Sequence, residues 1–200
     1  MTYELLTGLA VFALVTTLTP GPNNLMLMAS GANFGFRLTV PHMLGVSLGF
    51  MFMALMIGMG LAQLFQLYPM SYTVLKWLSV FYLLLLAWKI ATAARPGTQD
   101  SATGRPFTFM QAALFQWVNP KAWTMALTAI SVYSPAANLA SVTTVALVFG
   151  AINLPSSSCW TILGQKIQGL LTSPGRLAMF NISMALLLVV SLYPVLTTQP

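Results

Sequence analysis

Long apolar segments separated by short polar connections form the dominant pattern of this sequence. A transmembrane helix needs about 20 mostly apolar residues to cross the hydrocarbon core of a bilayer. Segments of at least this length lie at 4–33, 40–64, 70–91, 107–131, 139–163 and 176–197. The pattern therefore predicts an all-α, polytopic membrane protein with six transmembrane helices.

The composition supports a chain that is embedded in a membrane. Hydrophobic residues make up 58% of the chain and charged residues only 5%. A soluble domain has about a quarter of its residues charged, so this chain cannot cover a water-facing surface, and we expect lipid around it. The net charge is +6, but the basic residues form no run, which argues against nucleic-acid binding. Cys159 is the single cysteine, which excludes an internal disulfide, a CxxC redox pair and a cysteine metal cage. We also expect no metal, cofactor or catalytic residue.

The basic residues predict how the chain is oriented in the membrane. Arg37 lies in the first connection, Arg95 and Arg105 in the third, and Lys166 and Arg176 in the fifth. The other connections and both ends of the chain carry no Lys or Arg outside the spans. Because connections rich in Lys and Arg stay in the cytoplasm, we expect both termini on the opposite side.

The longest connection, 92–106, divides the single domain 1–200 into two repeats. Each repeat, 1–91 and 107–200, contains three predicted spans. An odd number of spans in each repeat places the two repeats in opposite senses across the membrane. The layout therefore predicts an inverted repeat joined by a cytoplasmic linker.

Proline interrupts the opening span of each repeat. The two motifs are Thr19-Pro20-Gly21-Pro22-Asn23-Asn24 and Asn119-Pro120-Lys121. A proline inside a helix removes a hydrogen-bond donor and clashes with the preceding turn. In hydrocarbon, irregular backbone survives only where it is buried in protein or lines a polar cavity. Paired interruptions in two halves are typical of the binding site of a secondary transporter, although prolines also kink transmembrane helices that bind nothing.

The broken helices predict a site for a small zwitterion. A carbonyl end attracts a cation, and an amide end attracts an anion. We expect Asn23, Asn24 and Asn119 to cap the restarting helices, and Lys121 to add a positive charge for a carboxylate, unless it snorkels to the interface. Thr16, Thr17 and Thr124 add hydroxyl groups nearby. The candidate substrate-binding residues are Thr19, Pro20, Gly21, Pro22, Asn23, Asn24, Gln116, Asn119, Pro120 and Lys121.

Other polar features allow different interpretations. The run 45–49 matches G-x-S-x-G, so Ser47 and His42 could form an intramembrane serine hydrolase. That motif needs a strained strand-to-helix turn, whereas these residues lie in a continuous predicted helix, where Gly45 and Gly49 suit close helix packing. A structural subunit remains a further alternative. Asn153 and Pro155 predict a lesser break in the fifth span.

The motifs resemble those of the lysine exporter and homoserine/threonine resistance (LysE/RhtB) family of amino-acid exporters. The likeness extends from the Thr-Pro-Gly-Pro run through 35–37, 45–49, 86–89 and 119–122, and thus over nearly the whole chain. The runs 45–50, 87–91 and 159–160 are most similar to the cysteine/O-acetylserine exporter branch. The resemblance implies efflux across the bacterial inner membrane, driven by the proton motive force, with periplasmic termini. A homodimer is one assembly left open.

One departure from the family bears on the substrate. Many members carry an acidic residue where this chain has Phe50. Glu4 and Asp100 are not placed to reach the middle of the bilayer. A second cation on the substrate would therefore be unpaired, which is costly in a buried site. We expect small neutral amino acids, such as cysteine, O-acetylserine, serine, threonine or homoserine, or another small solute on the same fold.

Overall fold

The computed structural model describes the chain except for residues 62, 64–66, 69, 94–104, 135–137 and 198–200. Every regular element in the described part is a helix, so the all-α class is confirmed. Most of the predicted linker, 94–104, lies outside the described residues. In chain order the elements are α1 (Tyr3–Leu18), α2 (Pro22–Phe34), α3 (Phe36–Met56), the π-helical turn η1 (Ile57–Leu61), α5 (Met70–Ala91), α6 (Phe109–Val118), α7 (Pro120–Tyr133), α8 (Leu139–Gln168), α9 (Pro174–Val190) and α10 (Tyr193–Thr197).

Local capping signals set several of the helix starts. Thr108 and Gln111 form a capping box at the start of α6, in which each side chain accepts a hydrogen bond from the other residue's backbone. The side chain of Asn138 accepts a hydrogen bond from a backbone amide in the first turn of α8. Ser173 caps α9 in this way, and Pro174 takes the first helical position. These polar side chains satisfy amide groups that a helix leaves unpaired at its first turn.

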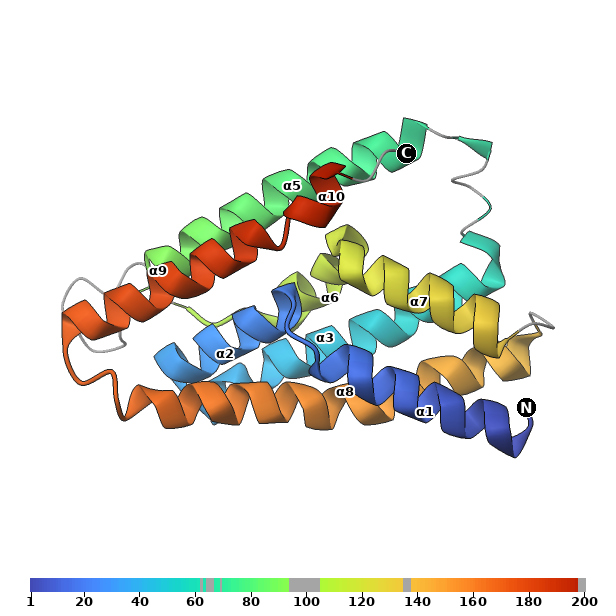
Figure 1. The fold of residues 1–200 in the computed structure, drawn as a ribbon, viewed down its shortest axis with the longest axis horizontal. Helices are drawn as coiled ribbons and strands as arrows, with labels where there is room; N and C mark the ends of the chain where they lie inside the picture. Colours follow the sequence, from blue (N-terminus) through green and yellow to red (C-terminus); the bar gives the residue numbers. More distant parts are fainter. Residues whose placement is uncertain (62, 64–66, 69, 94–104, 135–137, 198–200) are drawn as a thin grey trace.

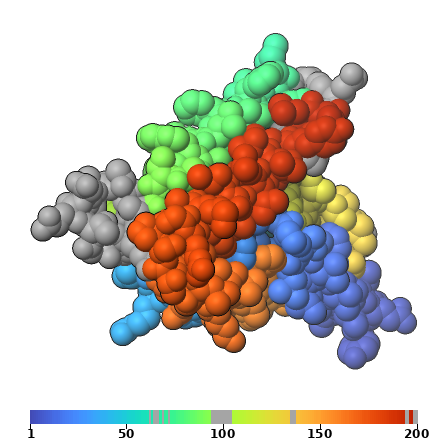
Figure 2. Space-filling model, turned by 60° about the vertical axis from the view of Figure 1, so that its left-hand side comes forward, coloured from blue at the N-terminus to red at the C-terminus, as the bar shows by residue number. Residues whose placement is uncertain are grey.

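The helices run back and forth along the long axis of the molecule (Figure 1). The connections from α2 to α3 and from α8 to α9 lie at one end, and the N-terminus lies at the other (Figure 1). One core cluster fills the space between α1, α3, α7 and α8, and a second joins α2 to α5 and α9. Figure 2 shows α5 and α9, in green and orange to red, as a pair lying side by side.

Three helical segments in the described part are each long and apolar enough to cross a membrane. They are Phe36–Leu61, Thr73–Ala91 and Leu139–Gln168. Helices α1 and α2 meet at an angle of 55°, and together they would make a fourth, broken span. The shorter helices α6, α7 and α9 do not reach this length individually, so six spans remain a prediction.

Glycines let the backbones of neighbouring helices approach closely. A Cβ atom at Gly45 would collide with the carbonyl of Phe109, and one at Gly49 would lie 2.6 Å from the Cα of Ala113. The G-x-S-x-G run of α3 therefore packs against α6, as small residues do in membrane bundles. The contact confirms close helix packing as the role of the two glycines.

Helix α8 continues through Pro155, so the lesser break expected at Asn153 and Pro155 is wrong. A single proline removes one helical hydrogen bond, and the part of α8 that follows Pro155 packs closely on α2. The backbone of Gly164 lies against Met28, and that of Thr161 against Gly31. These contacts hold α8 against α2 beyond the proline.

Large apolar side chains cover much of the outer surface. Trp77, Phe81 and Trp88 of α5 are each at least 60% exposed, and Phe52 of α3 is 55% exposed. A water-soluble monomer rarely exposes contiguous apolar surface on this scale. The surface is that of a protein surrounded by lipid, which agrees with the composition.

Candidate functional site

The two proline motifs lie in contact, although about a hundred residues separate them in sequence. Helix α1 ends at Leu18 and α2 begins at Pro22, while α6 ends at Val118 and α7 begins at Pro120. The ammonium group of Lys121 donates a hydrogen bond of 2.6 Å to the carbonyl of Thr19. It also lies 3.4 Å from the carbonyl of Pro20. The first turn of α7 thus holds the irregular segment between α1 and α2.

A reciprocal pair of amide side chains makes a second link between the motifs. The side-chain nitrogen of Asn23 donates to the Gln116 oxygen at 2.8 Å, and that of Gln116 donates to the Asn23 oxygen at 3.1 Å. Gln116 is fully buried and also donates to the carbonyl of Ala112 at 2.9 Å. Both amide groups are therefore held in one orientation, which fixes α2 against α6.

The capping prediction for α2 is wrong. The N-cap residue is Gly21, and no side chain caps this end of the helix. Pro22 takes the first helical position, which it favours because it has no N–H to satisfy, and this moves Asn23 and Asn24 inside the helix. Asn24 instead reaches back and donates to the carbonyls of Thr17 and Thr19, at 2.7 and 2.8 Å.

The start of α7 agrees with the cap predicted from the sequence. Asn119 is the N-cap residue, and its side-chain oxygen accepts a hydrogen bond of 3.2 Å from the amide of Lys121. Pro120 occupies the first helical position. The capping role predicted for Asn119 is therefore confirmed.

The ends of α1 and α2 differ in what they leave unpaired. At the carbonyl end of α1, Asn24 and Lys121 already donate to the carbonyls of Thr17 and Thr19 in this conformation. The amide end of α2 has no side-chain cap and carries the partial positive charge of a helix N-terminus. Gly21 makes room for the lysine here, since a Cβ atom at Gly21 would lie 2.7 Å from the Lys121 Cδ. The ammonium group of Lys121 and the N-terminus of α2 thus lie next to each other, and both contribute positive potential.

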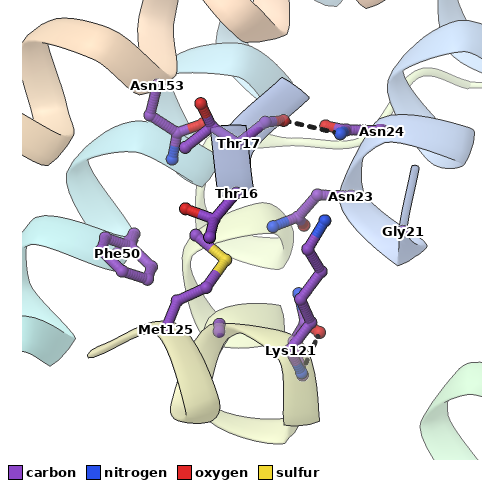
Figure 3. Close-up of a pocket in the computed structure, with 11 residues that line it drawn as sticks. Thr16, Thr17, Gly21, Asn23, Asn24, Phe50, Lys121, Met125 and Asn153 are labelled. Carbon is purple, nitrogen blue, oxygen red and sulfur yellow. Dashed lines mark hydrogen bonds between the residues drawn. The ribbon is translucent and has the colours of Figure 1, made fainter. Parts of the chain in front are cut away.

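These groups open onto a small cavity between five helices (Figure 3). Its free volume is about 20 Å³. This space holds about one water molecule. The cavity is therefore too small for an amino acid in this conformation. The lining residues are Thr16, Thr17, Gly21, Asn23, Asn24, Phe50, Asn119, Lys121, Ala122, Met125 and Asn153.

Comparison with known proteins establishes the family. The model of the family described as "LysE type translocator" matches residues 14–192. The chain belongs to the LysE family. Two curated relatives named cysteine/O-acetylserine efflux protein, from Escherichia coli (strain K12) and Shigella sonnei (strain Ss046), are each 33% identical over 191 residues. The matched region covers 94% of this chain and 96% of each relative. No solved structure matches the chain.

In this LysE family member, the predicted site residues have different positions around the cavity. Gly21, Asn23, Asn24, Asn119 and Lys121 line it. Gln116 lies behind Asn23 and orients it. The remaining candidates do not line the cavity: Thr19 and Pro20 form the irregular segment between α1 and α2, and Pro22 and Pro120 begin α2 and α7.

Besides Thr16 and Thr17, which the sequence placed nearby, four lining residues were absent from the predicted site: Phe50, Ala122, Met125 and Asn153. Phe50 of α3 is apolar and offers no signal in a transmembrane sequence that would separate it from a packing residue. Asn153 of α8 does offer one, because an amide side chain in the middle of a long apolar segment needs a partner. The sequence links it to a helix break, whereas its place in the structure is the wall of the cavity.

The arrangement around Ser47 and His42 differs from that of a serine hydrolase. Such an enzyme needs a hydrogen bond between its nucleophile and its base. In the described part of the chain, the Ser47 hydroxyl and both ring nitrogens of His42 have no hydrogen-bond partner. His42 is fully buried and packs on Phe107, with ring centroids 5.1 Å apart. The two residues therefore do not form a catalytic pair in this conformation.

Proposed function

We propose that this LysE family protein is a secondary exporter of small neutral amino acids or their derivatives. The observation that carries the proposal is the position of Lys121, whose ammonium group lies beside the uncapped amide end of α2 at a polar cavity. A carboxylate brought between these groups gains a charge-assisted hydrogen bond and the favourable end of a helix dipole. Every amino acid has such a carboxylate.

Acceptor groups for the ammonium of the substrate lie on α1. The Thr16 and Thr17 hydroxyls donate to the carbonyls of Phe12 and Ala13, at 2.6 and 2.7 Å. Their donor hydrogens are therefore used, and their oxygen lone pairs remain to accept from an ammonium. We propose that the substrate carboxylate draws Lys121 away from Thr19 as the cavity widens.

The charges at the cavity favour a substrate with no net charge. None of its lining residues is acidic, and Glu4, the one acidic residue in the described part, is exposed at the start of α1. A lysine or arginine substrate would bring a second cation near Lys121. At an effective dielectric constant near 20, two like charges about 4 Å apart repel by roughly 4 kcal/mol. This corresponds to a loss of several hundredfold to a thousandfold in affinity.

The proposed topology is an inverted repeat of six spans in the bacterial inner membrane. In it, α1 with α2 and α6 with α7 form broken spans, and both termini are periplasmic. The positions of the basic residues support this orientation. Arg37 and Arg176 lie in the first turns of α3 and α9, and Lys89 and Lys166 lie in the last turns of α5 and α8. These four helix ends lie at the side of the molecule where α2 meets α3 and α8 meets α9 (Figure 1). The proton motive force is the proposed energy source.

Counterflow in proteoliposomes tests the function directly. Vesicles containing only this protein are loaded with unlabelled O-acetylserine, and uptake of labelled O-acetylserine is followed, with protein-free vesicles as the control. Cysteine, serine, threonine and homoserine are expected to compete for uptake, and lysine is expected to compete poorly. Absence of flux with every amino acid would indicate a structural subunit or a carrier of another solute. An imposed pH gradient that leaves net efflux unchanged would exclude coupling to protons.

A further inference from the structure

The wall of the cavity farthest from Lys121 has its own chemistry. Asn153 of α8 and Phe50 of α3 lie on that side, with Thr16 of α1 and Met125 of α7 between them and the lysine (Figure 3). Residues from four helices therefore meet there. None of these residues carries a charge, whereas the opposite side has Lys121 and the amide end of α2.

Asn153 is a buried amide whose hydrogen-bonding capacity is only partly used. It is 7% exposed, and its side-chain oxygen accepts a hydrogen bond of 3.3 Å from the Ser157 hydroxyl. Within the described part of the chain its amide nitrogen donates to no partner, although the asparagine nitrogens of α2 and α9 all donate. This nitrogen is not among the fully buried side-chain atoms that lack a partner, so it is accessible from the cavity that Asn153 lines. Its N–H groups are therefore available to a water molecule or to an oxygen of a substrate.

The orientation of the substrate brings an acceptor to this donor, and this step rests on the proposed function. With the carboxylate at Lys121 and the ammonium at the threonine hydroxyls, the side chain of an amino acid extends toward Asn153 and Phe50. We infer that Asn153 is a specificity-determining residue, which donates a hydrogen bond to an oxygen acceptor on the substrate side chain. The matching substrate class is amino acids with a short hydroxyl- or ester-bearing side chain.

Phe50 sets the size and polarity of the same subsite. It is 1% exposed, and its ring packs on Phe149 with centroids 4.8 Å apart. The ring is therefore held in place and cannot yield to a longer substrate without disturbing the core. Met125 adds a flexible apolar surface beside it. A short uncharged side chain with one acceptor oxygen satisfies both the apolar wall and the amide donor.

Isosteric substrates separate a specificity role from a structural one. Homoserine and norvaline have the same shape, but the first ends in a hydroxyl and the second in a methyl group. Asn153→Leu removes the donor and keeps much of the volume. In counterflow competition, we expect the preference of the wild-type protein for homoserine over norvaline to fall by about tenfold in this variant, with norvaline transport retained. Ser156→Ala is the matched control, because it removes a buried polar side chain three residues further along α8. It should keep the wild-type preference for homoserine over norvaline.

A second variant tests the direction of the hydrogen bond. Asn153→Asp has nearly the same shape and keeps the oxygen that accepts from Ser157, but it offers the substrate an acceptor instead of a donor. The ester carbonyl of O-acetylserine can only accept, whereas the homoserine hydroxyl can also donate. We therefore expect Asn153→Asp to lose O-acetylserine relative to homoserine. This variant gives the answer if the leucine variant does not fold.

The outcomes distinguish this inference from the proposed function. An unchanged homoserine-to-norvaline ratio in Asn153→Leu, or an unchanged O-acetylserine-to-homoserine ratio in Asn153→Asp, would overturn the role of Asn153. A uniform loss of all substrates would also overturn it, since that result assigns Asn153 to the main-chain groups of the substrate or to folding. Failure of the wild-type protein to catalyse any amino-acid counterflow would instead reject the proposed function.

Discussion

Replacing Lys121 with methionine is the sharpest test of the site. The change keeps much of the length of the side chain and removes its charge. The ammonium group donates to the carbonyl of Thr19 at 2.6 Å, and this carbonyl also accepts from Asn24 at 2.8 Å. The carbonyl therefore keeps a partner in Lys121→Met, so we expect the protein to fold with only a small loss of stability.

The effect on transport should be much larger. A hydrogen bond between a charged donor and its partner contributes about 1.5–3 kcal/mol, and each 1.4 kcal/mol corresponds to a factor of ten. Losing the contact between Lys121 and the substrate carboxylate should weaken apparent affinity by roughly 10- to 150-fold. Counterflow of labelled O-acetylserine measures this loss, and the melting temperature in detergent reports folding.

A matched control distinguishes the loss of a positive charge at the cavity from the loss of a positive charge elsewhere in the protein. Lys166→Met removes an exposed lysine near the end of α8, away from the cavity. It should leave apparent affinity unchanged. If Lys121→Met transports O-acetylserine with the affinity of the wild-type protein, Lys121 has a structural role and the proposed carboxylate site is wrong.

Two further predictions concern the same region, and a third concerns the topology. Gly21→Ala should displace the lysine from Thr19 and reduce counterflow in a folded protein, because the new Cβ would lie 2.7 Å from Lys121 Cδ; Gly175→Ala, with no atom within 4 Å, should have no effect. Asn23→Leu and Gln116→Leu should each lower the free energy of unfolding by about 1–3 kcal/mol by leaving the other amide unpaired. The double variant should recover part of this loss in a double-mutant cycle. Reporter fusions should place both termini in the periplasm and the longest connection in the cytoplasm; cytoplasmic activity of a C-terminal fusion would contradict the topology.

The sequence by itself determined the class of the protein and much of its local structure. Apolar segments and the scarcity of charge are properties of short stretches and of the whole composition, so they predict helices in lipid without any tertiary information. The cap at Asn119 is also local, because the fixed backbone of Pro120 favours the first position of a helix. The same rule explains the error at Asn23 and Asn24, where Pro22 took the position ahead of them.

Only the tertiary structure decided which groups meet at the site. The contacts of Lys121 with Thr19 and of Asn23 with Gln116 join positions about a hundred residues apart, and no local pattern contains that pairing. Phe50 and Asn153 reach the cavity because α3 and α8 pack against the broken segments. The use of the α1 carbonyls by Asn24 and Lys121 was likewise invisible in the sequence, since a buried polar group takes whichever partner the packing brings within reach.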